Sequence, residues 1–272
     1  MNNLHRELAP ISDEAWGEIE QETARTLKRY LAGRRVVDIH GPAGSTLSAV
    51  GTGHLADIDP PGEGVRARQR QVLPLVELRV PFTLSRQQID DVARGAADPD
   101  WQPAREAARL IAAAEDQAIF AGYGAAGIGG IVPGVSNAPL ILPAAEVDYP
   151  MAFAQAAEQL RAAGIDGPYT AVLSAEAYTA VSEASDHGYP VIRHLRNVLD
   201  GELIWAPAIT GALVLTSRGG DFVLHLGQDL SIGYLSHTDD DVTLYLQESF
   251  TFQLLTAEAA VPLVTSAAGH SA

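Results

Sequence analysis

A predicted hairpin without a core of its own limits what this chain can fold into. Two extended runs flank a tip rich in proline and glycine, DPPGEG at residues 59–64, within a stretch of short strands and turns over residues 36–84. The returning arm, residues 65–72, alternates without a clear buried face. A hairpin that lies on its own core normally shows one apolar face. A neighbouring chain could cover this hairpin.

Two helices are predicted on either side of the hairpin. The first follows Ser12, which can cap it, and ends at Gly33. The second runs from Pro103, a residue typical of a first helical position, to about residue 120, and its alanine content predicts that it is buried. Side chains at helical spacing mark the first helix: Trp16, Ile19, Thr23, Leu27 and Leu31.

The rest of the chain mixes helices and strands, which predicts an α+β protein. A helix is predicted over about residues 150–163, and a strand over 169–173 leads through Ser174 into another short helix. No internal repeat is visible. Further strands, separated by turn sequences, are predicted over residues 203–207, 212–216, 221–226, 230–234 and 242–255.

Charge and composition exclude several classes of function. The 272 residues include 34 acidic and 18 basic side chains, and the formal charge of −16 disfavours nucleic acid and anionic membranes as partners. The absence of cysteine excludes disulfides and thiolate metal sites and fits a reducing compartment. The sequence shows no signal peptide, and no apolar run approaches the roughly 20 residues of a membrane-spanning helix. We therefore expect a cytoplasmic protein.

One glycine motif matches a nucleotide-binding pattern. Residues 122–127, GYGAAG, fit G-x-G-x-x-G, whose main-chain amides can hold a pyrophosphate at the start of a helix. The motif follows a predicted helix instead of a strand, and no helix is predicted to start within it. We interpret it as a loop.

The string SDHGYP, residues 185–190, places serine, aspartate and histidine side by side. A catalytic triad forms when such residues converge in space, and adjacent residues rarely point at one another. Glycine and proline indicate an exposed loop, so a solvated histidine is favoured over a general base. A pore-lining role is the alternative.

The remaining titratable residues predict neither a metal site nor a cofactor. The eight histidines show no H-E-x-x-H spacing. Glu115 and Asp116 lack the histidine partners of di-iron helices, and the three aspartates at residues 239–241 fit a turn better than a calcium loop. We expect no catalytic residue, no metal and no cofactor.

Long strings in nearly every part of the chain resemble the family 1 encapsulins, linocin-like shell proteins of bacterial nanocompartments. They occur in family order over about residues 1–264 and include long stretches without catalytic residue types. The resemblance is therefore more specific than any short motif above. The strings are MNNLHRELAPIS, RTLKRYLAGRRVVDIHGP, PFTLSRQQIDDVARG, GIDGPYTAVLS, SDHGYP, LIWAP, RGGDF, LGQDLSIGY and YLQESFTF.

The resemblance implies the fold of the Hong Kong 97 phage major capsid protein, an α+β fold. It has a peripheral domain with a spine helix, an axial domain at the five-fold axis, and an extended loop that pairs with neighbours. The implied segments are residues 1–47 (N-terminal arm and helix of the peripheral domain), 48–80 (extended loop), 81–130 (peripheral domain with spine helix), 131–224 (axial domain), 225–264 (peripheral strands) and 265–272 (disordered tail).

The resemblance also implies two functional sites. The N-terminal helix and nearby sheet would form a groove on the inner side of the shell for a targeting peptide at the C-terminus of the cargo. Arg34 and Asp38 would form its polar rim. A loop of Ser185, Asp186, His187, Gly188 and Tyr189 would line the five-fold pore and filter solutes by charge and size. The expected apolar lining of the groove is Leu27, Leu31, Val36, Leu230, Ile232 and Tyr234, each of which could equally be a core residue.

The implied function is structural and not enzymatic. About sixty copies would close into the simplest icosahedral shell and enclose a dye-decolorising peroxidase or a ferritin-like protein, linking the shell to oxidative stress or iron storage. One alternative is a phage major capsid protein, against which the acidic charge and the mature-like start argue. The other is a peptidase, whose catalytic residues would have to converge from distant segments.

Overall fold

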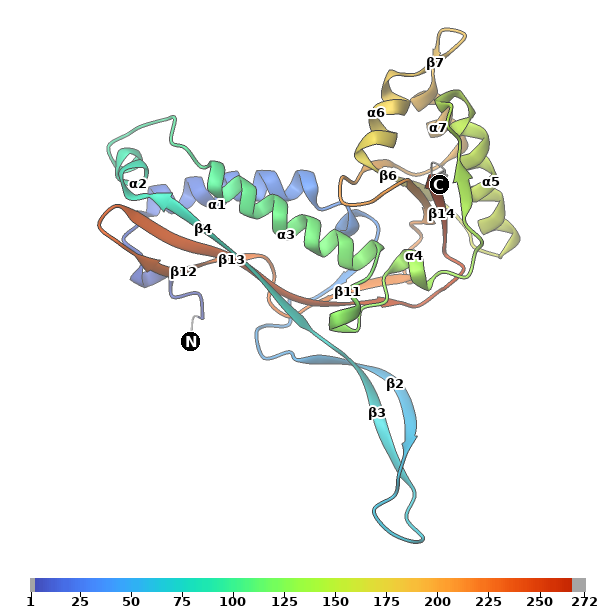
Figure 1. The fold of residues 1–272 in the computed structure, drawn as a ribbon, viewed down its shortest axis with the longest axis horizontal. Coiled ribbons are helices and arrows are strands. Elements are labelled where there is room, and N and C mark those ends of the chain that lie inside the picture. Colours follow the sequence, from blue (N-terminus) through green and yellow to red (C-terminus); the bar gives the residue numbers. More distant parts are fainter. Residues whose placement is uncertain (1–2, 266–272) are drawn as a thin grey trace, which may run out of the picture.

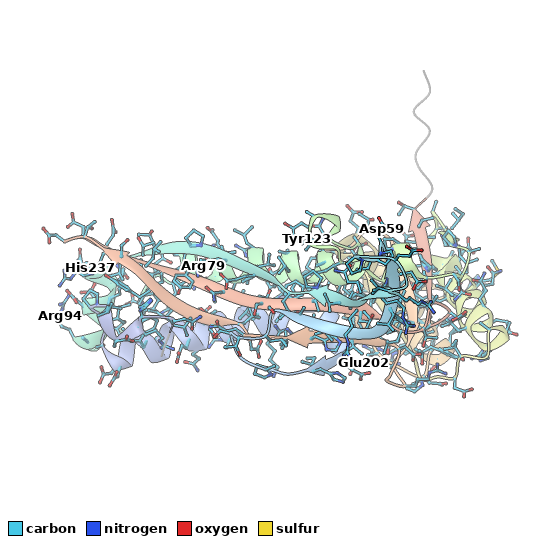
Figure 2. The ribbon with its side chains drawn as sticks, turned by 90° about the horizontal axis from the view of Figure 1, so that it is seen from below. Asp59, Arg79, Arg94, Tyr123, Glu202 and His237 are labelled. Atoms are coloured by element: carbon cyan, nitrogen blue, oxygen red, sulfur yellow. The ribbon has the colours of Figure 1, made fainter. Side chains whose placement is uncertain are left out.

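Two units of helices and sheet and one long hairpin make up the chain in the computed structural model, which describes residues 3–265. The first unit is elongated, the second lies at one end of it, and the hairpin projects away from both (Figure 1). Seen edge-on, the chain is a thin plate (Figure 2). Among residues 3–265, no helix combines the length and apolar character needed to cross a membrane.

The central strand of the first sheet is β13 (Asp241–Leu254). β4 (Val76–Ser85) pairs with one of its edges, while β12 (Ser231–His237) and β11 (Phe222–Leu226) share the other, all antiparallel. β1 (Asp38–His40) pairs parallel with β11. β13 is almost entirely buried, so it ties these strands into one sheet.

Three helices pack on this sheet: α1 (Asp13–Tyr30), α2 (Arg86–Ala93) and α3 (Gln102–Phe120). The Ser12 hydroxyl accepts a hydrogen bond from the N–H of Ala15 and caps α1, which confirms the first predicted helix. α3 confirms the second. α1 and α3 lie side by side (Figure 1). Small side chains on α3 permit this close approach, and the buried ones are Ala104, Ala107, Ala108, Ala112 and Ala118.

The second sheet forms the core of the other unit. Its two central strands, β10 and β6, are buried along their whole length, as expected of strands covered on both faces. The helices packed against it are α5 (Tyr149–Ala162), α6 (Ala175–Glu183) and α7 (Val191–Val198). The strand order is β5 (Leu140–Leu142), β14 (Ala260–Thr265), β10 (Ala212–Thr216), β6 (Tyr169–Leu173) and β9 (Leu203–Trp205).

Two strands cross the predicted segment boundaries. Residues 260–264 were placed in the segment of peripheral strands, with no strand predicted there, yet they form part of β14, which pairs with β10 in the second sheet. β11 begins inside the expected axial segment, 131–224, yet it belongs to the first sheet. Thr265, the first residue of the predicted tail, ends β14, and residues 266–272 lie outside the described part. The remaining boundaries stay a prediction.

The predicted hairpin is confirmed as β2 (Ala49–Ile58) and β3 (Ala67–Pro74), which pair with each other and project from the plate (Figure 1). Within residues 3–265, none of the three hydrophobic core clusters contains a residue of β2 or β3. Leu55 is 48% exposed and Val72 is 53% exposed. The hairpin therefore carries apolar surface that its own chain does not cover.

The glycine motif after α3 is a tight loop, as the sequence predicted. Gly122 and Gly130 both have positive φ angles. A Cβ on Gly130 would lie 2.3 Å from the nitrogen of Gly122, so the two chain segments meet too closely for any side chain. This packing explains Gly122, and the positive φ of Gly127 explains the last glycine of the motif, whereas a Cβ on Gly124 would meet no atom within 4 Å. The short elements are η1 (Arg6–Leu8), η2 (Gly33–Arg35), η3 (Gly124–Ala126), α4 (Ile131–Gly134), η4 (Glu146–Asp148), β7 (Ser185–Asp186) and β8 (Tyr189–Pro190).

Candidate functional site

A groove of about 320 Å³ lies between α1 and the outer edge of β12. Three residues expected at the peptide groove, Leu27, Leu230 and Ile232, meet here. Leu27 comes from α1 one turn after Thr23, and the other two come from β12 and the residue before it. Most of the surface is apolar, which suits an apolar segment. The full lining is Leu4, Arg6, Glu20, Thr23, Ala24, Leu27, Leu230, Ser231, Ile232 and Leu246.

The N-terminal arm forms one wall of the groove. The main-chain N–H of Tyr234 donates a hydrogen bond of 2.8 Å to the carbonyl of Leu4, which joins the arm to the edge of β12. Arg6 pairs with Glu20 on α1 at 2.6 Å and stacks over the Trp16 ring at 4.1 Å. The arm is therefore fixed to both elements that define the groove.

Thr23 contributes a polar atom to this apolar lining. The residue is 3% exposed, and among the described residues its hydroxyl has no hydrogen-bond partner. A buried hydroxyl without a partner is costly, so such atoms are uncommon in native structures. The sequence located Thr23 on the right helical face, but it gave no sign that the hydroxyl would be left unpaired.

Three expected apolar residues lie outside the groove lining. Leu31, at the end of α1, is 9% exposed, and Val36 is 7% exposed and belongs to the core between the two sheets. Tyr234 packs beside that lining, and its hydroxyl lies 2.6 Å from Nδ1 of His237. For Leu31 and Val36 the core interpretation is therefore the better one.

Arg34, expected at the polar rim, lies outside the lining of this groove. Its guanidinium is surrounded by carboxylates at 2.6 Å from Glu115, 2.7 Å from Asp229 and 3.1 Å from Glu248. Glu115 on α3 and Glu248 on β13 are fully buried. Burial alone would lower the pKa of Arg34, but hydrogen bonds and charge attraction to Glu115 and Asp229 raise it above its usual value. Arg34 thus joins η2 to α3 and β13 from within.

Two acids in the same region have raised pKa values. Burial raises the pKa of Asp116 to about 7, although the N–H groups of Gly33 and Ala32 donate hydrogen bonds to its carboxylate. Burial and the neighbouring Glu115 also raise the pKa of Glu248 well above its ordinary value. These groups link the end of α1 to α3 and belong to the framework behind the groove.

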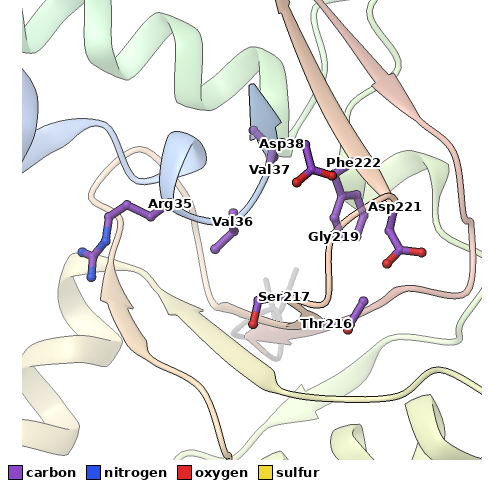
Figure 3. Close-up of a pocket in the computed structure, with 9 residues that line it drawn as sticks. All are labelled: Arg35, Val36, Val37, Asp38, Thr216, Ser217, Gly219, Asp221 and Phe222. Carbon is purple, nitrogen blue, oxygen red and sulfur yellow. The ribbon is translucent and has the colours of Figure 1, made fainter. Parts of the chain in front are cut away.

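Asp38 also lies away from the groove. It lines a small polar pocket of about 130 Å³ between the end of η2 and the turn before β11 (Figure 3). Its carboxylate accepts a 2.5 Å hydrogen bond from the N–H of Gly220. Across the pocket, burial alone would raise the pKa of Asp221, but hydrogen bonds from Arg218, at 2.9 Å, and from Thr256 together with the charge of Arg218 lower it. Asp38 fixes a turn.

The predicted pore residues gather at the tip of a short hairpin, β7 and β8, which protrudes from the second unit (Figure 1). His187 and Gly188 at its turn both have positive φ angles, 47° and 83°, as in a type I′ turn. The His187 side chain is 97% exposed and lies 3.7 Å from Asp186. The ring of Tyr189 contacts His194 at 4.6 Å between centroids. The exposed imidazole is not held in place for catalysis.

The described residues contain no group of three or more histidine, cysteine or acidic side chains that could hold a metal ion.

Comparison with known proteins identifies the family. A family model described as "Encapsulating protein for peroxidase" matches residues 1–251. The type 1 encapsulin shell protein of Rhodococcus erythropolis is 60% identical over 263 residues, which is 97% of this chain and 100% of that protein. The corresponding shell protein of Mycobacterium tuberculosis is 57% identical and covers 97% of this chain and 99% of its own length.

Solved structures with low sequence identity share the fold. A virus-like particle from Pyrococcus furiosus has a TM-score of 0.62 at 16% identity, covering 92% of this chain and 99% of that chain. A chain of Mycobacterium phage Bobi has a TM-score of 0.56 at 17% identity, covering 88% and 91%. The expected Hong Kong 97 capsid fold, with its mixture of helices and strands, is therefore confirmed. The chain belongs to the type 1 encapsulin shell proteins, subunits of self-assembling shells.

Proposed function

We propose that this chain closes into an icosahedral shell of about sixty copies in the cytoplasm and holds a cargo enzyme inside. The observation that supports shell assembly is the hairpin of β2 and β3, whose exposed apolar side chains Leu55 and Val72 would be covered by a neighbouring subunit. Contacts between flat subunits around their rims would bury more than the roughly 1,600 Å² of a standard interface.

The cargo is held through its C-terminal segment, which lies in the groove between α1 and β12. The apolar lining of Leu27, Leu230 and Ile232 supports this role, because a surface of this kind favours apolar side chains of a bound peptide. The family description names a peroxidase, and this favours a dye-decolorising peroxidase over a ferritin-like protein as the cargo. The shell itself performs no catalysis in this proposal.

The hairpin of β7 and β8 lines the opening at each five-fold axis. Five copies of Asp186 and His187 would then form a charged ring, and such a ring selects small solutes by charge and size. The exposed position of the His187 side chain supports this role. Substrates of the enclosed enzyme would enter here.

Two other functions have less support. A phage major capsid protein would share the fold, but the relatives at 57–60% identity are encapsulin shell proteins, whereas the phage likeness is at 17% identity. A peptidase would need an oriented triad. Ser185, Asp186 and His187 instead follow one another on a protruding hairpin with an exposed imidazole.

Co-expression tests the cargo proposal. Green fluorescent protein fused to the C-terminal segment of a dye-decolorising peroxidase is produced together with the shell, and fluorescence is measured in the shell fraction. We expect loading with the parent shell and loss of loading with Leu230→Asp, which adds a charge to the groove. Leu235→Asp is the matched control, because Leu235 lies on β12, which begins directly after Leu230, but is 53% exposed and outside the groove. Equal loading of both variants would reject this groove as the cargo site.

A further inference from the structure

The groove is bounded by a free strand edge. In the order of the first sheet, β12 stands at the end and pairs with β13 alone. Its pairing with β13 is regular from Ser231 to Tyr234, and the irregularity begins only after Tyr234. An edge strand of this kind presents a row of main-chain donors and acceptors.

The N-terminal arm reveals which main-chain groups of β12 point outward. Tyr234 donates its N–H to Leu4, so its main-chain groups face away from β13. In a regular antiparallel pair this direction alternates along the strand, so Ile232 also directs its N–H and carbonyl outward. No other segment of the described chain pairs with this edge at Ile232, where β12 forms the wall of the groove. Within residues 3–265, the arm thus uses the edge position at Tyr234, and no strand pairs with the next one at Ile232.

The opposite wall offers a second, independent polar group. Thr23 on α1 lines the same groove, and its buried hydroxyl has no partner among residues 3–265. An apolar side chain bound in the groove would leave this hydroxyl unpaired, whereas a main-chain amide passing between α1 and β12 could satisfy it.

We propose that the cargo segment binds as an added strand on the outer edge of β12, in line with the N-terminal arm, with its main chain hydrogen-bonded to Ile232 and to the hydroxyl of Thr23. This inference rests on the groove being the cargo site and adds the mode of binding. Side chains of an added strand alternate between the groove and the opposite side. The groove therefore selects a partner with small apolar residues at every second position.

A proline scan of the cargo segment tests the added strand. Each residue of the peroxidase segment in the green fluorescent protein fusion is replaced by proline, which removes one N–H, and in parallel by alanine, which retains it. We expect proline to reduce loading more than alanine at alternate positions, because only alternate N–H groups face β12. If proline and alanine cause equal losses throughout, the added strand is wrong although the groove still binds cargo. If the parent segment does not load at all, the proposed function fails and this inference with it.

Variants of Thr23 give a second readout. Thr23→Val preserves the shape of the side chain without the hydroxyl, and Thr23→Ser preserves the hydroxyl. We expect Val to weaken loading roughly three- to tenfold, the usual effect of one hydrogen bond, and Ser to load nearly as the parent, with shells of unchanged size in both. Parental loading by Thr23→Val would overturn the assigned hydrogen bond.

Discussion

The Nη2 atom of Arg34 lies 2.6 Å from Oε2 of Glu115, a carboxylate on α3 that has no exposure to solvent. Glu248 on β13 and Asp229 before β12 complete the set around the same guanidinium. One arginine on η2 therefore joins this turn to α3 and to β13 of the first sheet. The groove rests on this framework.

Removing the arginine should destabilise each subunit strongly. Arg34→Met leaves buried carboxylates without their cation, and breaking a buried ion pair in this way costs about 3–5 kcal/mol. We expect a large drop in the denaturant midpoint measured by fluorescence. Arg35→Met is the matched control, because the Arg35–Glu202 pair is exposed and such pairs contribute little. Equal effects of the two variants would contradict the structural role of Arg34.

Stability should depend on pH through the buried acids. Asp116 has a pKa of about 7 in the folded chain against an ordinary 3.8, so the folded state holds a proton that the unfolded state has lost. The free energy of unfolding should therefore be highest below the ordinary value and fall as the pH rises towards 7. The raised pKa of Glu248 acts in the same direction. Asp221, whose pKa is lowered, acts in the opposite direction and only on acidification below its ordinary value.

Glu248→Gln isolates one part of this dependence. The amide resembles the protonated acid and cannot ionise, so the variant should lose less stability than the parent as the pH rises. Thermal unfolding of both proteins across this pH range measures the difference. Parallel curves would show that Glu248 has the same pKa in the folded and unfolded chains, and would contradict the raised value.

Shortening the hairpin should prevent assembly without unfolding the chain. Gly51 and Val72 are paired, so replacing residues 52–71 by an Asn-Gly turn closes a short hairpin at this point. The three core clusters gain nothing from β2 or β3 within the described residues, and we expect the far-ultraviolet circular dichroism per residue to stay native-like. Light scattering should find small species. Intact shells from this variant would show that the hairpin is dispensable.

Substitutions at the exposed tip of the proposed pore should change the access of substrates to the enclosed enzyme and leave the stability of the subunit unchanged. Replacing Asp186 and His187 by alanine removes a carboxylate and an exposed imidazole from a surface turn, and surface changes of this kind have small effects on folding. With a peroxidase enclosed, we expect altered turnover of charged substrates and unchanged turnover of a neutral one of similar size. Identical rates for both substrates in parent and variant would remove the filter.

Local signals made much of the fold predictable. The Ser12 cap and the helical spacing located α1, and the proline- and glycine-rich tip located the hairpin of β2 and β3. β14 was missed, because Pro262 lies within it and its character as a strand comes from pairing with the distant β10. Tertiary pairing of this kind has no signature in the short window around the strand.

The groove was only partly predictable for the same reason. Leu27, Leu230 and Ile232 were assigned from the matching family strings and do meet, whereas Arg34, expected at the rim, lies outside this lining in a buried ion cluster. Its partners Glu115 and Glu248 are 81 and 214 residues away along the chain, so the sequence around Arg34 resembles an exposed basic cluster. Adjacent acids within an alanine-rich buried helix were the available signal for the ion cluster.

Size-exclusion chromatography with multi-angle light scattering, followed by negative-stain microscopy of the main peak, tests the shell most directly. The account predicts a particle of megadalton mass with uniform, round, hollow outlines. A species near the chain mass of 28.7 kDa, or a small oligomer, would contradict it.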